Sequence, residues 1–555
     1  MRDAGTLRAK TFPETCMHTE YDLVIRNGRI IDGGGNPWYT ATIGIIGGTI
    51  AAVFPAGESL RGRKVIDANG EVVSPGFIDT HSHDDALLFI EPQCRQKVLQ
   101  GVTTDVVGNC GTSLAPLSNE HLNHSRETLA LLGAGELVDD IWSMRTYAEY
   151  LHRLESVQLG INVVPLVGHS VIRIAVMGLE NRAPNQPEMA RMKQLTEEAM
   201  KAGAFGLSSG LIYAPANYAR TEEIIELARV AAAYGGIYTS HIRNEGDHQI
   251  DAISEAITIG HSAGIPVHIS HHKIFGRKNW GGSRETLQLF ADARNEGLAM
   301  TWDQYPYPAG STFLVAALPP LIQEQGVRSY SQKLKDPDIR GKVREEIEKG
   351  TGTPWQNIIE AIGFESMFIA TAPRHPDFIG KSIAAIAQSL AKDAFDVYFD
   401  LVIEEETEAT VVIFGMDDVD IDRILKHPYT MIGSDGIPAF GTAKPHPRLT
   451  GTFPRILGRY VREKGLITLE DAIRKMTSLP AQTFGLHKKG LVRPGMDADL
   501  VIFDPDTIID NATFEDPLQP PEGISRVIVN GEIAAEEGSI AGASSGKVLR
   551  RRPTS

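Results

Sequence analysis

Cysteine, long apolar runs and positive charge are all scarce in this chain of 555 residues. Its three cysteines, Cys16, Cys94 and Cys110, are too few for a disulfide framework, which fits a reducing compartment. No run of 18 apolar residues occurs, and the N-terminus lacks the apolar core of a signal peptide. The sequence therefore predicts a cytoplasmic protein with no membrane partner.

The shortage of basic residues bears on the kind of partner. The chain has 54 Lys and Arg against 70 Asp and Glu, a net charge of −16. Proteins that bind nucleic acid need a basic surface, so we exclude nucleic acid as a partner. A small anionic substrate needs only a few local cations and stays compatible with this balance. No pattern in the chain defines an oligomeric state.

The two terminal regions share one style of sequence. Residues 1–20 are polar and unpatterned, which predicts a mobile extension. Residues 21–74 are short β-branched runs separated by Asn-Gly, Gly-Gly and Asp-Gly, a pattern typical of hairpins, and similar runs return over 488–540. We predict one small β-sandwich built from both regions, with a flexible tail over 541–555. Two unrelated β-units are the alternative.

The central region alternates between strand-like and helix-like segments. Eight apolar runs separated by helical stretches predict an α/β fold, a TIM-like (β/α)8 barrel over residues 75–487 that carries the catalytic site. The spacing of the runs widens late in this region. This predicts a lid-like insertion at about 274–430, because long βα loops often cover an active site.

Several of the predicted strands end in residues that can bind a metal. These residues are His81, His83, Cys110, His169, His241, His271 and Asp435. The carboxyl ends of barrel strands converge, so side chains separated by hundreds of residues would meet in one pocket. His81 and His83 stand two apart and therefore point to the same side of a strand, where both could reach one ion.

The two internal cysteines have different surroundings. Cys110 lies between Gly108 and Gly111 in VVGNCGTS, where the chain turns out of a strand beside the HxH segment. A thiolate at that position would be a tight zinc ligand. Cys94 has no such setting and is interpreted as an inert buried thiol.

Two further strand ends are ambiguous from the residues alone. The segment VHISHHK holds three histidines, and alternation places His268 and His272 on one side and His271 on the other, without showing which side faces the pocket. In TMIGSDG, Asp435 could simply begin a turn. Beside a metal cluster it would instead be a candidate general base.

Together these segments resemble a known family. FIDTHSHDD, VVGNCGTS, GLSSGLIYAP, SHIRNEG, ISHHK, DQYPYPAGST and MIGSDG are similar to the D-aminoacylases, the N-acyl-D-amino-acid deacylases of the amidohydrolase superfamily. The resemblance extends from Tyr21 to about Glu536. The HxH pair is found broadly in the amidohydrolase superfamily, whereas the cysteine after VVGN and the SHHK segment narrow the resemblance to the D-aminoacylases.

The resemblance implies a zinc hydrolase and a ligand set. Cys110, His241 and His271 would hold one tightly bound Zn²⁺, and His81 with His83 would form a second, weaker metal position. One zinc suffices for the chemistry, because it activates water and polarises an amide carbonyl.

The implied reaction is hydrolysis of an N-acyl-D-amino acid to a carboxylate and a free D-amino acid. A metal-bound water attacks the amide and Asp435 carries the proton to the leaving nitrogen. The preference for the D form follows from the resemblance alone.

The substrate's free carboxylate requires cations and hydroxyl groups. Within the family motifs the candidates are Lys273, Arg448, Tyr213, Tyr307 and Ser311.

Three alternatives remain at this point. One is an amidohydrolase that opens a cyclic amide, as dihydropyrimidinases and hydantoinases do, and another is a D-dipeptidase. A lysine in place of Cys110 would favour such classes, and it is absent. The remote alternative is a non-catalytic scaffold.

Overall fold

The computed structural model describes residues 20–551 apart from 59, 325, 350–354, 440 and 442. Almost all of the predicted mobile extension, Cys16 included, lies outside the described residues, as do residues 552–555. None of the helices within the described part of the chain is both long and apolar enough to span a lipid bilayer.

Parallel strands make up the centre of the molecule. One sheet has the order β6–β7–β8 and a second has the order β17–β13–β12–β11–β10–β9. Their bounds are β6 Phe77–Asp79, β7 Val102–Val107, β8 Asn162–Pro165, β9 Val167–Gly168, β10 Gly206–Gly210, β11 Ile237–His241, β12 Val267–Ile269, β13 Met300–Gln304 and β17 Thr430–Ile432. The strands are almost entirely buried, as expected for parallel sheets covered by helices.

The two parallel sheets are linked at both ends of the strand order. Leu166, between β8 and β9, donates its backbone N–H to Val107. Beyond β6 and β17, Ser82 and Gly436 form a parallel bridge. All these strands therefore present their carboxyl ends on the same side of the molecule.

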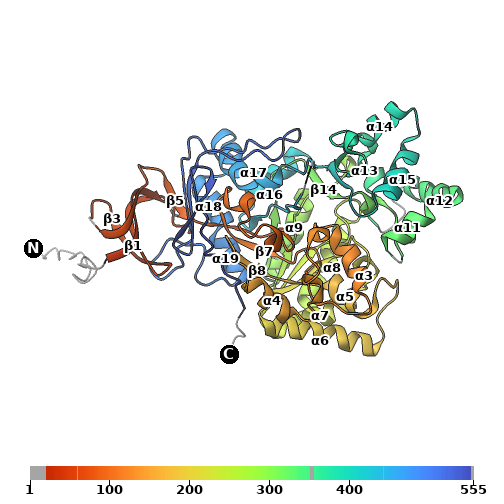
Figure 1. The fold of residues 1–555 in the computed structure, drawn as a ribbon, viewed down its shortest axis with the longest axis horizontal. Coiled ribbons are helices and arrows are strands. Elements are labelled where there is room, and N and C mark those ends of the chain that lie inside the picture. Colours follow the sequence, from red (N-terminus) through yellow and green to blue (C-terminus); the bar gives the residue numbers. More distant parts are fainter. Residues whose placement is uncertain are drawn as a thin grey trace, which may run out of the picture.

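Helices follow the strands and pack around them (Figure 1). They are α4 Tyr147–Glu155, α5 His169–Met177, α6 Gln186–Ala202, α7 Thr221–Ala233, α8 Gln249–Ala263, α9 Ser283–Asn295, α16 Asp418–Lys426, α18 Leu469–Met476 and α19 Ser478–Phe484. The longest, α6, starts at a capping box in which Asn185 and Glu188 bond to each other's backbone N–H. The α/β class predicted from the alternation is confirmed.

An insertion between β13 and β17 carries its own small antiparallel sheet, in the order β14–β16–β15. Its strands are β14 Ala309–Phe313, β15 Met367–Thr371 and β16 Thr410–Phe414, and its helices are α10 Pro320–Gln323, α11 Val327–Lys333, α12 Pro337–Glu348, α13 Ile358–Ile362, α14 Ile383–Leu390 and α15 Ala394–Glu405. The insertion is shorter than the predicted range of about 274–430. Because α9 and β13 complete a β/α unit of the central array, the extra segment begins only after Gln304.

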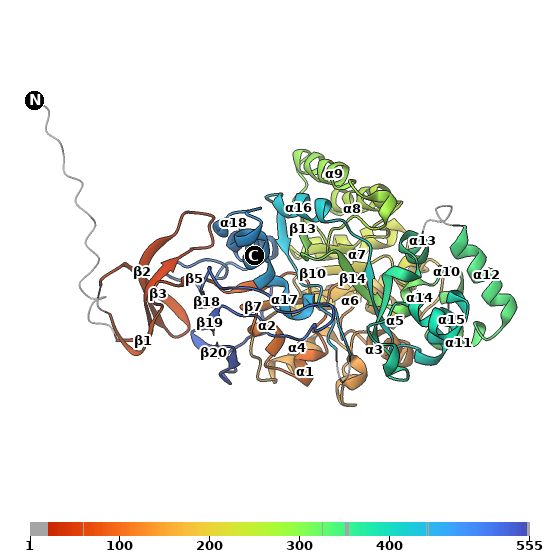
Figure 2. The same ribbon diagram turned by 90° about the horizontal axis from the view of Figure 1, so that it is seen from above.

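Both terminal regions join in one nine-stranded sheet, at the opposite end of the molecule from the insertion (Figure 2). The strands are β1 Glu20–Ile30, β2 Tyr39–Ile46, β3 Thr49–Pro55, β4 Arg61–Asp67, β5 Val72–Pro75, β18 Leu500–Phe503, β19 Ile524–Val529, β20 Glu532–Glu536 and β21 Ser539–Ile540. Antiparallel pairing of β5 with β18 connects the two regions. The strand pairing is that of a single sheet, so it does not by itself give the predicted sandwich.

The segment predicted to be a flexible tail differs from that prediction over its described part. Gly546 donates its N–H to Leu159, and Val548 forms a bridge with Val163 beside β8. Arg550 forms a salt bridge with Glu155 at the end of α4. The segment thus runs along the amino side of the parallel strands. The composition of the tail gave no sign of this docking, because its partners lie hundreds of residues away.

Candidate metal centre and active site

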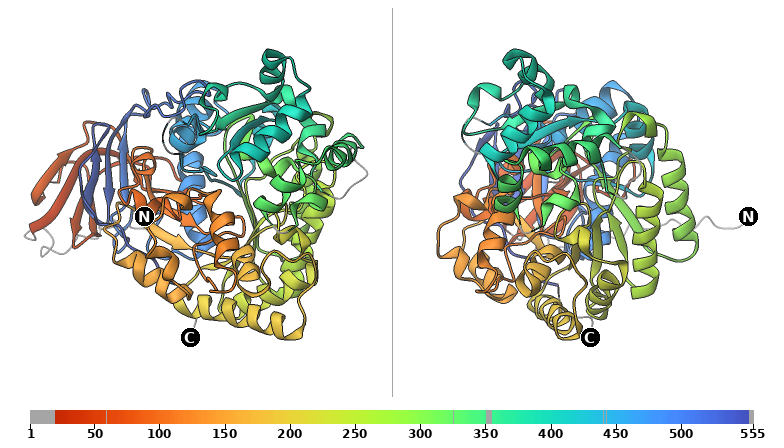
Figure 3. Two further views of the ribbon diagram at one scale, coloured as in Figure 1. Left: turned by 45° about the vertical axis from the view of Figure 1, so that its right-hand side comes forward. Right: turned by 90° about the vertical axis from the view of Figure 1, so that its right-hand side faces the viewer.

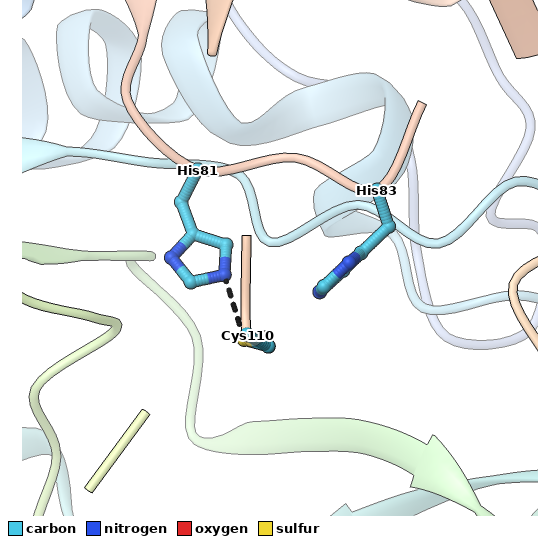
Figure 4. A group of neighbouring side chains, drawn as sticks. All are labelled: His81, His83 and Cys110. Carbon is cyan, nitrogen blue, oxygen red and sulfur yellow. Dashed lines mark hydrogen bonds between the residues drawn. The ribbon is translucent and has the colours of Figure 1, made fainter. Parts of the chain in front are cut away.

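The predicted metal ligands and Asp435 meet at the carboxyl ends of the parallel strands. They follow or end different strands: His81 and His83 come after β6, Cys110 after β7, His241 at the end of β11, His271 after β12 and Asp435 after β17. All six are buried. Figure 4 shows His81 and His83 side by side on one loop, with Cys110 beneath them.

Three of these residues have a left-handed backbone. The φ angles are 50° at Cys110, 37° at His271 and 49° at Asp435. This conformation costs a non-glycine residue about 1–3 kcal/mol and persists only where the surroundings impose it. Each of the three thus turns the chain sharply at a strand end and directs its side chain into the pocket. Such strain concentrates at functional sites.

A thiol and two imidazoles converge on one point. Cys110 Sγ lies 3.6 Å from His241 Nδ1 and 3.6 Å from His271 Nε2, and these two nitrogens are 2.9 Å apart. Burial raises the pKa of the Cys110 thiol, but charge on His81 and hydrogen bonds from His241 and His271 lower it well below its usual value. A thiolate and two ring nitrogens facing one another are the donor set that Zn²⁺ prefers.

A second group of donors faces Asp435. His83 Nε2 lies 3.2 Å and His81 Nε2 3.5 Å from Asp435 Oδ1, and His81 Nε2 is also 3.2 Å from Cys110 Sγ. Burial lowers the pKa of His83, but hydrogen bonds to Asp435 and Cys110 outweigh it and raise the pKa to about 9. The chemistry of these residues would fit a second metal, and Cys110 belongs to both groups of donors.

Two carboxylates that the sequence analysis missed hold the imidazoles in place. Glu245 Oε1 lies 3.0 Å from His271 Nδ1, and Glu245 Oε2 lies 3.7 Å from His241 Nε2. Asp303 accepts the backbone N–H of His271 at 2.8 Å and lies 3.4 Å from His81 Nδ1. Carboxylates bonded to the far nitrogen of a ligand fix its orientation. Glu245 stands four residues after His241, a spacing that could have signalled the contact.

The hydrogen-bond partners of the three histidines in VHISHHK show which of them belongs to the donor cluster. His268 Nε2 lies 2.6 Å from Asp303 Oδ2, and His272 Nε2 lies 3.0 Å from Thr286 Oγ1. Of the three, His271 contacts the thiol, with its Nε2 3.6 Å from Cys110 Sγ. The structure therefore brings the predicted member of the three to the cluster.

A buried ion pair braces the loop that carries Asp435. The Lys97 ammonium lies 2.5 Å from Asp79 Oδ2 and donates to Ser434 Oγ at 2.7 Å, with no exposed side-chain surface. Asp79 Oδ1 accepts the N–H of Ser434 at 2.8 Å and that of His81 at 3.2 Å. These bonds tie the loops after β6 and β17 together, directly beside Asp435.

Asp435 is paired with a predicted substrate residue. Arg448, at the start of α17 (Arg448–Arg455), places one terminal guanidinium nitrogen 2.8 Å from Asp435 Oδ2 and donates from the other to the carbonyl oxygen of Ser311 at 3.2 Å. Burial raises the pKa of Asp435, but Arg448, followed by His271 and His83, holds it well below its usual value. The carboxylate is thus kept ionised.

Lys273, Tyr213 and Ser311 line a cavity that opens from this cluster. The Lys273 ammonium is occupied by Glu245, 2.5 Å away. The Tyr213 hydroxyl lies 3.2 Å from Thr312 Oγ1, and its ring stands edge-on to His241.

The structure places Tyr307 outside the lining of this cavity. Its ring packs against His446 and Phe514, away from the metal donors. Tyr305, two residues earlier, lines the cavity instead, with its ring under both Lys273 and Arg448. A bend of the chain after β13 separates the two tyrosines, and residue type alone could not distinguish them.

Comparison with known proteins identifies relatives of the whole chain. The model of the amidohydrolase family matches residues 64–535. The chain is 40% identical to the D-aminoacylase of Alcaligenes xylosoxydans xylosoxydans, over 96% of this chain and 98% of that protein. It is 39% identical to the N-acyl-D-glutamate deacylase of the same organism, over 93% of this chain and 94% of the relative.

A solved structure agrees with the same grouping. The N-acyl-D-glutamate deacylase of Bordetella bronchiseptica superimposes with a TM-score of 0.82 at 37% identity, over 96% of this chain and all of that one. Its crystal structure contains zinc and a phosphonate inhibitor that mimics the tetrahedral intermediate of the reaction. The resemblance predicted from the sequence motifs is thereby confirmed.

Proposed function

The chain belongs to the amidohydrolase family, and we propose that it hydrolyses N-acyl-D-amino acids to a carboxylate and a free D-amino acid, using zinc. The observation that carries the proposal is the convergence of the Cys110 thiol, His241 and His271 beside the ionised Asp435. The names of the relatives, both deacylases of D-amino acids, support the same reaction.

The proposed metal ligands divide into two groups. Cys110, His241 and His271 would hold the tightly bound zinc, and His81 with His83 would form the weaker second position. The geometry of the donors supports this assignment, since Cys110 Sγ lies 3.6 Å from both His241 Nδ1 and His271 Nε2. When bound, zinc lowers the pKa of a coordinated water toward about 7 and polarises the amide carbonyl.

Asp435 supplies the acid–base chemistry. Its ionised carboxylate can accept a proton from the attacking water and return it to the amide nitrogen as the C–N bond breaks. The left-handed backbone and the Lys97 brace hold the carboxylate toward His81 and His83. Arg448 keeps it charged between turnovers.

The substrate carboxylate requires its own partners. Arg448 has a buried Nε with no hydrogen-bond partner, and Ser311 lies within reach of the same guanidinium. Arg448 would therefore bind the carboxylate while it pairs with Asp435. Lys273 and Tyr213, which line the adjoining cavity, would complete the pocket.

We also propose that the parallel strands close into a barrel and that the terminal sheet forms a β-sandwich. The Ser82–Gly436 bridge and the Leu166–Val107 hydrogen bond support an eight-stranded barrel in which β8 and β9 count as one strand. Curvature of the terminal sheet would give the β-sandwich. A cytoplasmic location stays a prediction of the sequence.

A substrate panel with metal analysis tests this function. The purified full-length protein should contain close to one zinc per chain and release acetate from N-acetyl-D-methionine. The rate with N-acetyl-L-methionine should be lower by roughly 100-fold or more. A pocket that fits the D enantiomer must place at least one group of the L enantiomer wrongly. Opening of dihydrouracil with no deacylation by the zinc-loaded protein would overturn the proposal in favour of a cyclic amidase.

A further inference from the structure

The cavity that opens from the metal donors is walled mainly by apolar side chains. They come from the central strand ends, from the segment around α3 (Leu122–Ala130) and from the insertion. The apolar residues are Leu131, Leu132, Leu179, Ile212, Phe275, Phe313, Val315, Ala316, Ile358, Ile413 and Ile437. The insertion packs beside the central region of the molecule (Figure 3), and its residues Phe313, Val315 and Ile413 line the cavity.

The charged groups around the cavity are already matched to one another. Lys273, the one lysine among the described lining residues, is held by Glu245. Arg448, in the adjoining recess, is held by Asp435 and retains only the donors needed for a single carboxylate. A second substrate carboxylate would therefore enter an apolar region where the described lining offers it no available cation.

We infer that this cavity selects N-acyl-D-amino acids with a neutral, apolar side chain and rejects those with an acidic one. The inference rests on the function proposed above and goes further by naming the substrate class. Sequence identity alone does not distinguish a neutral from an acidic substrate side chain, since the chain is almost equally similar to a D-aminoacylase and to an N-acyl-D-glutamate deacylase. Burying an unpaired carboxylate against apolar side chains is costly, whereas burying a methyl or thioether group is favourable.

Three N-acetyl-D-amino acids of similar size separate charge from shape. Methionine, glutamine and glutamate should be compared on the zinc-loaded protein. We expect kcat/KM for N-acetyl-D-methionine to exceed that for N-acetyl-D-glutamate by roughly 100-fold or more. The value for N-acetyl-D-glutamine should lie between them, because its side-chain amide is polar but uncharged. The acetyl group is constant, so its contribution cancels.

A substitution in the cavity lining tests whether the lack of an available cation causes the selectivity. Gln323 reaches the cavity from α10, and its side chain bonds to the carbonyl oxygen of Leu318. Gln323→Lys should raise kcat/KM for glutamate by roughly three- to tenfold relative to methionine, and Gln323→Met, the uncharged control of similar length, should not. Equal or better turnover of glutamate than methionine by the unaltered protein would overturn the inference and leave the deacylase function standing. No hydrolysis of any of the three would overturn both.

Discussion

The carboxyl ends of the parallel strands and the core of the nine-stranded terminal sheet are both buried, yet they are built in opposite ways. In the terminal sheet the interior is apolar: Leu500 and Ile502 of β18 are completely buried and pack in a cluster with Val73 of β5. At the strand ends the interior holds ionised groups, and three non-glycine residues adopt a left-handed backbone. One region is arranged for stability and the other for chemistry.

The contrast shows which parts of the molecule lower the stability of the folded state. Buried charges and left-handed residues each disfavour the folded state unless their neighbours compensate for them. Around Asp435 the compensation comes from Arg448 and from the Lys97–Asp79 pair. Changes at the strand ends should therefore abolish activity, whereas changes in the terminal sheet should lower stability and leave turnover intact. Four substitutions test that division.

Cys110→Ala should have the largest effect. It removes the thiolate from the proposed tight zinc site, so we expect zinc affinity and activity to fall roughly 100-fold or more at neutral pH. Zinc content by elemental analysis and deacylase rate provide the measurements. Cys94→Ala, at the other described cysteine, is the matched control and should keep both, since burial and the carboxylates of Asp84 and Asp105 raise the pKa of that thiol well above its usual value. Unchanged zinc content in Cys110→Ala would contradict the assignment.

Asp435→Asn should separate metal binding from proton transfer. We expect kcat to drop by roughly 10²–10⁴-fold, the usual contribution of a general acid–base group, while zinc is retained. Asp417→Asn is a suitable control, because asparagine can still cap α16 there. Near-normal turnover of Asp435→Asn would remove this residue from the mechanism.

Ile502→Ala should show the opposite behaviour. Removing this buried side chain from the terminal sheet should lower the free energy of unfolding by about 2–5 kcal/mol, with kcat/KM unchanged. Urea unfolding and a rate assay below the transition give both quantities. Ile46→Ala, at an exposed position of β2, should stay within about 0.5 kcal/mol of the original protein. Loss of activity in the folded Ile502→Ala protein would show that the two regions are coupled.

Arg550→Ala should have the smallest effect. Its salt bridge with Glu155 is partly exposed, so we expect at most about 1 kcal/mol of stability to be lost, and less at high salt. Turnover should not change. A larger loss of stability would mean that the docked C-terminal segment contributes to folding of the whole parallel-strand region.

Much of the candidate site was predictable because strand ends are marked in the sequence. Apolar runs that stop at His81, Cys110, His241 and Asp435 identify the positions, and parallel strand topology brings them together. The supporting groups were not predictable. Asp303, Glu245 and Lys97 are charged residues like dozens of others until their partners are known. Likewise, the choice of Tyr305 over Tyr307 depends on a bend in the chain.

The sequence by itself determined the α/β class and the strand-end residues able to bind a metal, because periodicity and strand-end chemistry are local properties. Only the tertiary structure decided that Arg448 pairs with Asp435, that the tail docks beside β8 and that the cavity wall is apolar. These features depend on distances between segments far apart in the chain, and such distances exist only once the chain has folded.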